Sequence, residues 1–308
     1  NAAANVQVRI KDKLGVCYAS SDTFSIRPAS LLLAATYPST PPVAGVAFDM
    51  TATAQNTGGV KTTAYTGTPA IKNDSNNNPI TDWTTFSILE GSLVGSFAAA
   101  VNGVAQGDAA DPFKYRNVGP VNFPAATATA SPVGDTTYTL TSGDQSNGDC
   151  IADSYSNVLS GGMYGCNIGS TALTTGRFIP DHYEVENVVT TACGPYSYFG
   201  QTPAAAPTVL LTAMSADGSQ LTRLLSTYPN KSAFTIEAMN GAVSLANPAT
   251  ATPVFMDLTT PENDWPAPGQ DGGIYKNMAS GRVPRPAVTA PANPPSYENF
   301  SLRTTVTD

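Results

Sequence analysis

The chain has 308 residues, of which 41% are hydrophobic and only 12% charged, whereas a soluble domain typically carries about 25% charged residues. Its net charge is −8 and its 15 basic residues form no cluster, which excludes nucleic acid as a partner, because such binding depends on neutralising phosphates. No apolar stretch approaches the ~18 to 20 residues of a membrane-spanning helix. The 26 glycines and 25 prolines are scattered through a Thr-rich chain, which favours short strands and frequent turns.

Alternation of apolar and polar residues predicts the first strands. It occurs in residues 6–11 and again in residues 23–27. The clearest run is residues 46–54, where every second residue is apolar, as expected of a strand with one buried face. This run ends at the Asn-Thr-Gly-Gly sequence of residues 56–59, which is typical of a turn, and the chain then continues to Tyr65.

A similar arrangement returns later in the chain. Residues 209–228 have the same length as residues 46–65, with a turn sequence in nearly the same place. Each of the two segments follows an apolar stretch that ends in proline, at Pro28 and at Pro180. This similarity favours two related sandwich domains in tandem, and the alternative is a chance likeness between two amphipathic hairpins.

We therefore expect an all-β fold of tandem Ig-like β-sandwich domains with Pro-containing junctions. Residues 1–27 are expected to be the end of an upstream β domain and the strand that leads into the next one. Residues 28–180 would form the first sandwich and residues 181–308 the second, and the sequence leaves open whether the second is complete at its C-terminal end. We interpret the chain as a piece of a larger protein.

The four cysteines indicate disulfides in an oxidising, extracytoplasmic compartment, because none of them forms the closely spaced pairs of a zinc site. Cys150 and Cys166 enclose a loop of Gly, Ser and Asn that contains little apolar surface. A bridge across a loop of this length contributes about 3 kcal/mol in the chain-entropy model, so we expect these two to be paired. Cys17 and Cys193 are then left to each other or to partners outside the chain.

The only histidine, His182, could act as a catalytic base beside Asp181, but no nucleophile motif accompanies it. We expect a structural role at the domain junction instead, formed by Arg177, Phe178, Pro180, Asp181 and His182. The glutamates are isolated in the sequence, and no pair of acids of the glycosidase type stands out. We therefore expect that the chain is not an enzyme and has no catalytic residues.

Calcium is the one cofactor that the sequence raises, and spacing alone does not establish it. Asp74, Asn76 and Asn78 place oxygen side chains at alternate positions, as a calcium loop does, but the pattern then fails where the loop needs Gly and Glu. Asp149 and Asp153 beside Cys150 could also gather a cation. No other cofactor or metal is expected.

Several aromatic residues are candidates for a platform on which a sugar could stack, although such residues are more often part of a core or a junction. They are Trp83, Trp265, Tyr196, Tyr198 and Phe199.

Four segments together resemble the MshQ-like family, large bacterial surface proteins associated with the biogenesis of MSHA-type type IV pili. The segments are Ser-Asp-Thr-Phe-Ser-Ile-Arg-Pro at 21–28, Met-Tyr-Gly-Cys-Asn-Ile-Gly at 163–169, Gly-Arg-Phe-Ile-Pro-Asp-His-Tyr at 176–183 and Cys-Gly-Pro-Tyr-Ser-Tyr-Phe-Gly-Gln at 193–201. They stand in the family's order, and Pro195 is a departure, since the family more often runs from Gly straight into an aromatic strand. The resemblance implies a secreted, multi-domain protein at the cell surface or on a pilus, with no assigned active site.

The function expected from the sequence is an extracellular structural segment of a pilus-associated or surface-fibre protein. Its partners would be other copies of itself or pilus and surface proteins. The alternative is a carbohydrate- or receptor-binding adhesin module, whose partner would be a glycan or a host receptor. Phage tail and capsid proteins share the composition, which alone does not separate them from surface proteins.

Overall fold

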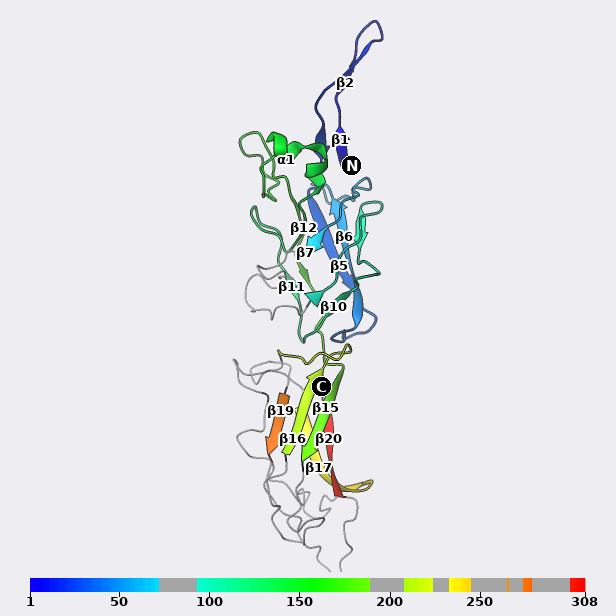
Figure 1. Cartoon of the computed structure of the whole chain (residues 1–308), viewed down its shortest axis with the longest axis vertical. Coiled ribbons are helices and arrows are strands. Elements are labelled where there is room, and N and C mark those ends of the chain that lie inside the picture. Colours follow the sequence, from blue (N-terminus) through cyan, green and yellow to red (C-terminus); the bar gives the residue numbers. More distant parts are fainter. Residues whose placement is uncertain are drawn as a thin grey trace, which may run out of the picture. The chain divides into compact units, whose positions relative to one another are not determined.

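The computed structural model describes residues 1–71, 93–188, 208–223, 233–244, 265, 274–278 and 300–307. Within these residues the fold is all-β, as predicted: strands make up nearly all the regular structure, and the helices are two short turns (Figure 1). The chain divides into two compact units, Asn1–Ile179 and Pro180–Asp308, which we call unit 1 and unit 2. The predicted change of domain at residues 180 and 181 lies next to this division.

Unit 1 contains fourteen of the described strands and both helical turns. The strands are β1 (Ala3–Val6), β2 (Arg9–Lys11), β3 (Cys17–Ala19), β4 (Phe24–Ile26), β5 (Ser30–Thr36), β6 (Ala47–Gln55), β7 (Ala70–Ile71), β8 (Leu93–Val94), β9 (Val104–Gln106), β10 (Phe113–Tyr115), β11 (Asn122–Phe123), β12 (Val133–Asp135), β13 (Ile168–Gly169) and β14 (Leu173–Thr174). A 3₁₀ turn, η1 (Tyr138–Ser142), leads into the single helical turn α1 (Asp144–Asn147).

The core of unit 1 lies between sheets, as in a sandwich. One sheet has the order β5-β6-β10-β8, with β9 also paired to β6, and the smaller sheets are β13-β12-β7 and β11-β14. Strand β6 confirms the predicted half-buried strand, because Phe48, Met50, Ala52 and Ala54 are buried and the residues between them are not. The core joins these side chains to buried residues of the other sheets, such as Val133.

One end of this core is aromatic. Phe178 is buried among Tyr37, Phe48 and Tyr115, with ring centroids 5.1 to 5.7 Å away. Edge-to-face and tilted contacts of this kind add about 0.5–1.5 kcal/mol per pair to the burial of area. The last residues of unit 1 are therefore fixed to its core, and this is the position of the predicted junction.

A buried carboxylate is at the centre of the other end of unit 1. Asp135 is 1% exposed and accepts four hydrogen bonds: from the Tyr65 hydroxyl (2.7 Å), the backbone N–H and hydroxyl of Thr137 (2.8 and 2.9 Å), and the N–H of Tyr138 (3.1 Å). Because a buried charge is costly unless it is hydrogen-bonded, this set of donors is what permits an acid in the core. It also fixes the start of η1.

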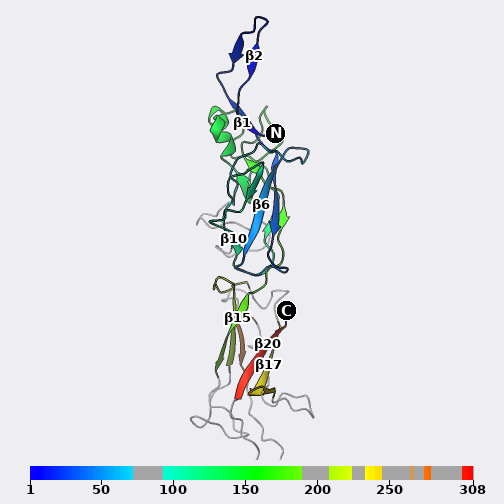
Figure 2. The ribbon, with the colours of Figure 1, turned by 90° about the vertical axis from the view of Figure 1, so that its right-hand side faces the viewer.

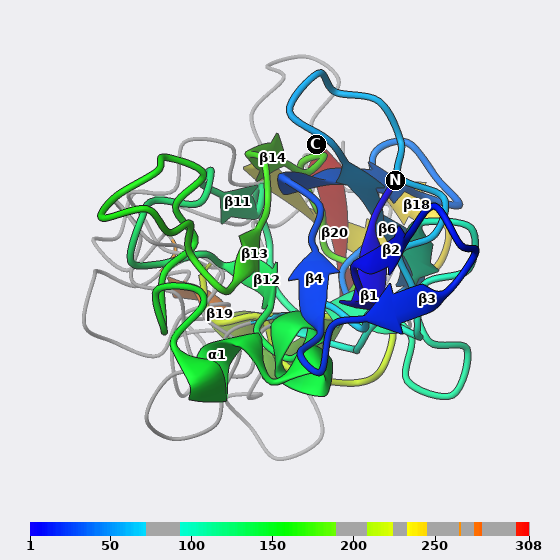
Figure 3. The same ribbon diagram turned by 90° about the horizontal axis from the view of Figure 1, so that it is seen from above.

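Residues 1–27, predicted to end an upstream domain, belong to unit 1. Ala2 is buried in its core, β1 pairs with β4, and both strands contact η1. Beyond β1 and β4 the chain forms the β2–β3 hairpin, which extends away from the rest of unit 1 (Figures 1 and 2) and lies in front of it when viewed from above (Figure 3).

Unit 2 contains two three-stranded sheets, β15-β16-β19 and β18-β17-β20. Their strands are β15 (His182–Val188), β16 (Thr208–Met214), β17 (Ala233–Asn240), β18 (Val243–Ser244), β19 (Ile274–Met278) and β20 (Phe300–Thr307). The side chains of Leu211 and Ala213, from β16, are fully buried, as is that of Leu221. The pairings between the described strands of unit 2 are antiparallel.

The two units share one local arrangement. Strand β5 follows Pro28 and strand β15 follows Pro180, each has seven residues, and each pairs antiparallel with the next long strand, β6 or β16. Both β6 and β16 then run into a tight turn closed by a side chain: Asn56 accepts from two N–H groups in one, and Ser215 from one in the other. The similarity noted in the sequence therefore corresponds to a shared local arrangement.

The Tyr65–Asp135 bond gives unit 1 a dependence on alkaline pH. Burial, and then the charge of Asp135, raise the pKa of Tyr65 far above its ordinary value of 10.0. Above about pH 10 the unfolded chain loses this phenolic proton and the folded chain keeps it, so stability falls by about 1.4 kcal/mol per pH unit from this residue alone. We expect Tyr65→Phe to be about 2 kcal/mol less stable at neutral pH, because it removes a donor from a buried carboxylate, and to lose less stability above pH 10 than the wild type.

The measurement is urea unfolding followed by circular dichroism between about pH 9 and pH 11. The matched control is Tyr37→Phe, since the Tyr37 hydroxyl accepts a bond from the N–H of Gly176 (3.0 Å) and does not touch a carboxylate. An equal slope of stability with pH in Tyr65→Phe and wild type would contradict the assignment.

Candidate functional site

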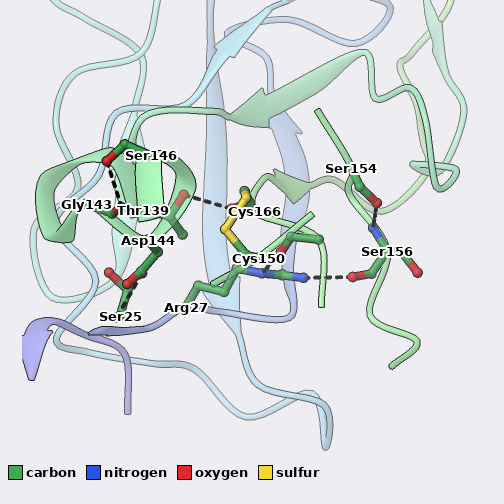
Figure 4. Close-up of a disulfide and its surroundings, with 11 residues drawn as sticks. Ser25, Arg27, Thr139, Gly143, Asp144, Ser146, Cys150, Ser154, Ser156 and Cys166 are labelled. Carbon is green, nitrogen blue, oxygen red and sulfur yellow. Dashed lines mark hydrogen bonds between the residues drawn. A yellow bond between two sulfur atoms is a disulfide. The ribbon is translucent and has the colours of Figure 1, made fainter. Parts of the chain in front are cut away.

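A cavity of about 520 Å³ opens beside the Cys150–Cys166 disulfide, and its surroundings are shown in Figure 4. One wall is the segment that leads into unit 1, one is the turn after β6, and the third is formed by α1 and the disulfide loop. The lining residues are Phe24, Ser25, Ile26, Arg27, Pro28, Ala29, Asn56, Thr57, Thr139, Asp144, Asp149, Cys150, Asn157, Gly162, Met163, Tyr164 and Gly165. Two of the segments that carry the family resemblance, residues 21–28 and 163–169, meet here.

The disulfide predicted between Cys150 and Cys166 is confirmed. The two residues are 16 apart in the sequence, and their Cα atoms are 5.1 Å apart. Backbone bonds also close the base of the loop: the N–H of Ile151 donates to the carbonyl of Tyr164 (2.8 Å), and the N–H of Cys166 donates to that of Ile151 (3.0 Å). A loop poor in apolar side chains is thus fixed at both ends by a covalent bond and by a short β-bridge.

The Arg27 guanidinium joins the first segment of unit 1 to this loop. Its Nη2 donates to the carbonyl of Ser156 (2.9 Å) (Figure 4), its Nε to that of Gly165 (2.7 Å) and its Nη1 to that of Pro28 (2.9 Å). Burial lowers the pKa of Arg27, and three charge-assisted bonds compensate for the lost hydration. Only glycine fits at 165, because a Cβ there would clash with the backbone of Ser154.

Asp144 fixes the opposite wall. Its Oδ2 accepts a hydrogen bond from the backbone N–H of Ser25 (2.9 Å), which lies on β4 (Figure 4). The carboxylate is buried and belongs to α1, so it connects the helical turn with strand β4. Residues 25 and 27 of the first wall are therefore bonded to two other parts of the cavity: Ser25 to Asp144 of α1, and Arg27 to the disulfide loop.

The mouth of the cavity carries exposed groups of two kinds. Phe24 is 40% and Tyr164 52% exposed, although both are large aromatic side chains. The carboxylate of Asp149 is exposed, and the described residues offer it no hydrogen bond or ion pair. The cavity therefore combines aromatic surface with a carboxylate available to a ligand.

The suggested pairing of Cys17, with Cys193 or with a partner outside the chain, stays a prediction, and Cys17 itself is a free, exposed cysteine in β3. Cys193 lies outside the described residues.

The predicted junction residues fall on both sides of the boundary between the units. Phe178 is buried in unit 1, and Arg177 beside it is exposed. In unit 2 the N–H of Asp181 donates to the carbonyl of Met214 (2.9 Å), and the Asp181 carboxylate hydrogen-bonds with Nδ1 of His182 (2.7 Å). These contacts order the first residues of β15.

Of the calcium candidates, the structure describes Asp149 and Asp153. In the parts of the chain that the structure describes, no three His, Cys, Asp or Glu side chains gather as a metal site would require, and this includes Asp149 and Asp153. Asp74, Asn76 and Asn78 lie outside the described residues.

Among the aromatic candidates, Trp265 is buried and contacts Tyr183 with ring centroids 6.2 Å apart, so it is a core residue of unit 2. The other four lie outside the described residues: Trp83, Tyr196, Tyr198 and Phe199. The aromatic residues at the cavity, Phe24 and Tyr164, were not singled out by the sequence reasoning. Their signal was present, because both lie in segments that carry the family resemblance.

Comparison with known proteins assigns the chain to a family. The family model for DUF6701, third domain, matches residues 155–308, which is half of the chain. The chain belongs to the DUF6701 family. No curated protein matched, and no solved structure matched.

The DUF6701 third-domain match begins inside unit 1, between the two disulfide cysteines. Cys166 lies within the match and Cys150 precedes it, so the bridge ties the start of the matched segment to the residues before it. Within the described ranges, no helix of this DUF6701 chain is long and apolar enough to span a membrane.

Replacing both cysteines, as Cys150→Ser with Cys166→Ser, is expected to lower the stability of unit 1 by about 3 kcal/mol, because the unfolded chain gains the freedom of the open loop. Urea unfolding of the double variant measures the change. The Cys17→Ser variant is the control and should unfold like the wild type, since Cys17 is unpaired and exposed. Equal stabilities of all three proteins would refute the structural role of the bridge.

Arg27→Lys is expected to cost about 2 kcal/mol, because an ammonium group cannot reach all three carbonyls that the guanidinium fork serves. Arg9→Lys, on the exposed strand β2, should change stability by less than about 0.5 kcal/mol. Thermal unfolding of the two variants gives the comparison, and similar losses in both would show that the Arg27 contacts do not stabilise the loop.

Proposed function

We propose that this chain is an extracellular structural segment of a pilus-associated or surface-fibre protein of the MshQ-like type. Three observations support the proposal: the all-β fold, a disulfide of the kind that persists in oxidising compartments, and the four sequence segments that resemble MshQ-like proteins. Membership of the DUF6701 family is compatible with it.

The observation that carries the proposal is the exposed apolar face of the β2–β3 hairpin. Ile10 lies opposite Tyr18 in the register, so these side chains share one face, and Val8 and Val16, which directly precede β2 and β3, lie two positions before them along the chain. All four are about half exposed or more, and Leu14 at the tip is 89% exposed. A two-stranded hairpin is at best marginally stable alone in water, and contiguous apolar surface of this kind marks a site of association.

The partner that fits this hairpin is another copy of the chain. Arg9, Lys11 and Lys13 give the hairpin region three positive charges against the single negative charge of Asp12, whereas the whole chain has a net charge of −8. Electrostatic attraction therefore favours docking of the hairpin on the acidic body of another copy over pairing of two hairpins. A contact between different surfaces of two copies repeats from one copy to the next, which is the geometry of a fibre.

Sedimentation velocity over a range of concentrations tests this proposal. We expect the wild type to self-associate, and Ile10→Lys with Tyr18→Lys to remain monomeric, because the two charges interrupt the apolar face. The matched control is Val60→Lys with Val101→Lys, which adds the same charge at two exposed valines outside the hairpin, 63% and 72% exposed.

The control should associate like the wild type, and added salt should weaken association in both. A wild type that is monomeric at every concentration, or a control that loses association as fully as the hairpin variant, contradicts the proposed contact.

A further inference from the structure

We propose that the cavity beside the Cys150–Cys166 disulfide binds a neutral hexopyranose unit of a glycan. The inference stands apart from the proposed assembly, because the residues that carry it line the cavity and do not belong to the apolar face of the β2–β3 hairpin. The volume of about 520 Å³ lies within the range of about 300–1,000 Å³ that is usual for ligand pockets.

The aromatic side chains at the mouth match the apolar face of a sugar ring. Phe24 comes from β4 and Tyr164 from the disulfide loop, and both keep a large part of their surface in water. Ile26 and Met163 extend the apolar lining between them. The C–H face of a pyranose covers such a surface and leaves the hydroxyl groups at its rim free to bond elsewhere.

Polar groups for those hydroxyls line the same cavity. The Asp149 carboxylate accepts hydrogen bonds only and has no partner among the described residues, so it fits hydroxyl donors. Asn157 donates through its amide nitrogen to the carbonyl of Ala29 (2.8 Å), which orients its side chain and leaves the amide oxygen as an acceptor. The charged lining consists of two carboxylates, Asp144 and Asp149, and one guanidinium, Arg27, whose charge is already engaged by backbone carbonyls, and this net negative lining disfavours an anionic ligand.

The site is held in place before any ligand arrives. The disulfide and the Arg27 bonds fix the loop that carries Tyr164 and Asn157, and this lowers the ordering cost of binding. Gly162, which lines the cavity, has a positive φ value of 84°, a conformation suited to glycine, and it leaves this part of the wall without a side chain.

A peptide strand is a poorer fit, although β4 is at the edge of its two-stranded sheet. Addition of a strand needs free backbone groups along that edge. The N–H of Ser25 in the middle of β4 already donates to the Asp144 carboxylate. The edge that faces the cavity is therefore blocked, and recognition must come from side chains, which suits a sugar.

The test is titration of the isotope-labelled chain with methyl glycosides of glucose, galactose, mannose and N-acetylglucosamine, followed by amide chemical shifts. At least one of these sugars should produce saturable shifts in residues 24–29 and 162–165, with a Kd on the order of 1 mM, as expected for a ligand of this size. N-acetylneuraminic acid, which is anionic, should not bind at the same concentrations.

Two variants locate the contact, each with a matched control. Tyr164→Ala is expected to weaken binding at least about fivefold, and Asp149→Asn about tenfold. Val101→Ala and Asp111→Asn remove an apolar side chain and a carboxylate from exposed positions outside the cavity and should bind like the wild type. The proposal is overturned if no neutral sugar shifts these residues, if N-acetylneuraminic acid binds better, or if the Tyr164 variant binds as well as its control.

Discussion

The Arg27 guanidinium is the contact on which the candidate site depends. Two of its three bonds, to the carbonyls of Ser156 and Gly165, join the start of the chain to a loop more than a hundred residues later, and the third is to the neighbouring Pro28. The loop has little apolar surface of its own, so the hydrophobic effect cannot hold it against unit 1. A charged fork that serves three carbonyls, with a disulfide at the base of the loop, provides what apolar packing lacks there.

Two buried acids also hold segments in place by hydrogen bonds to backbone groups. Only 12% of its residues are charged, yet Asp135 and Asp144 are both buried. Each of them holds backbone N–H groups: Asp135 those at the start of η1, and Asp144 that of Ser25 on β4. A carboxylate can accept several bonds at once, so one acid can order a turn that has no apolar face. These two side chains therefore fix short segments by hydrogen bonds where there is no long strand pairing to hold them.

The sequence predicted the features that depend on local pattern. The alternation of residues 46–54 gave strand β6, and the composition of the loop between Cys150 and Cys166 gave the bridge. The sequence did not predict the partners of Arg27, because two of the three Arg27 bonds end on backbone carbonyls distant in the sequence. Every residue has a backbone carbonyl, so the residue type does not indicate which one is bound. Exclusion alone could not decide the partner of Cys17, because two cysteines left over can also pair outside the chain.

The apolar side chains exposed on β2, β3 and β4 have one physical explanation in common. Their exposure to water is unfavourable, and they lie outside the core of unit 1. Because side chains alternate along a strand, they are placed on defined faces of short, paired strands. On the hairpin they share one face with no wall opposite, which suits a broad protein partner. On β4 they border a cavity with a carboxylate and a fixed loop, which suits a small polar ligand. The difference lies in what surrounds the apolar surface, and this is why we propose two distinct contacts for one segment of 27 residues.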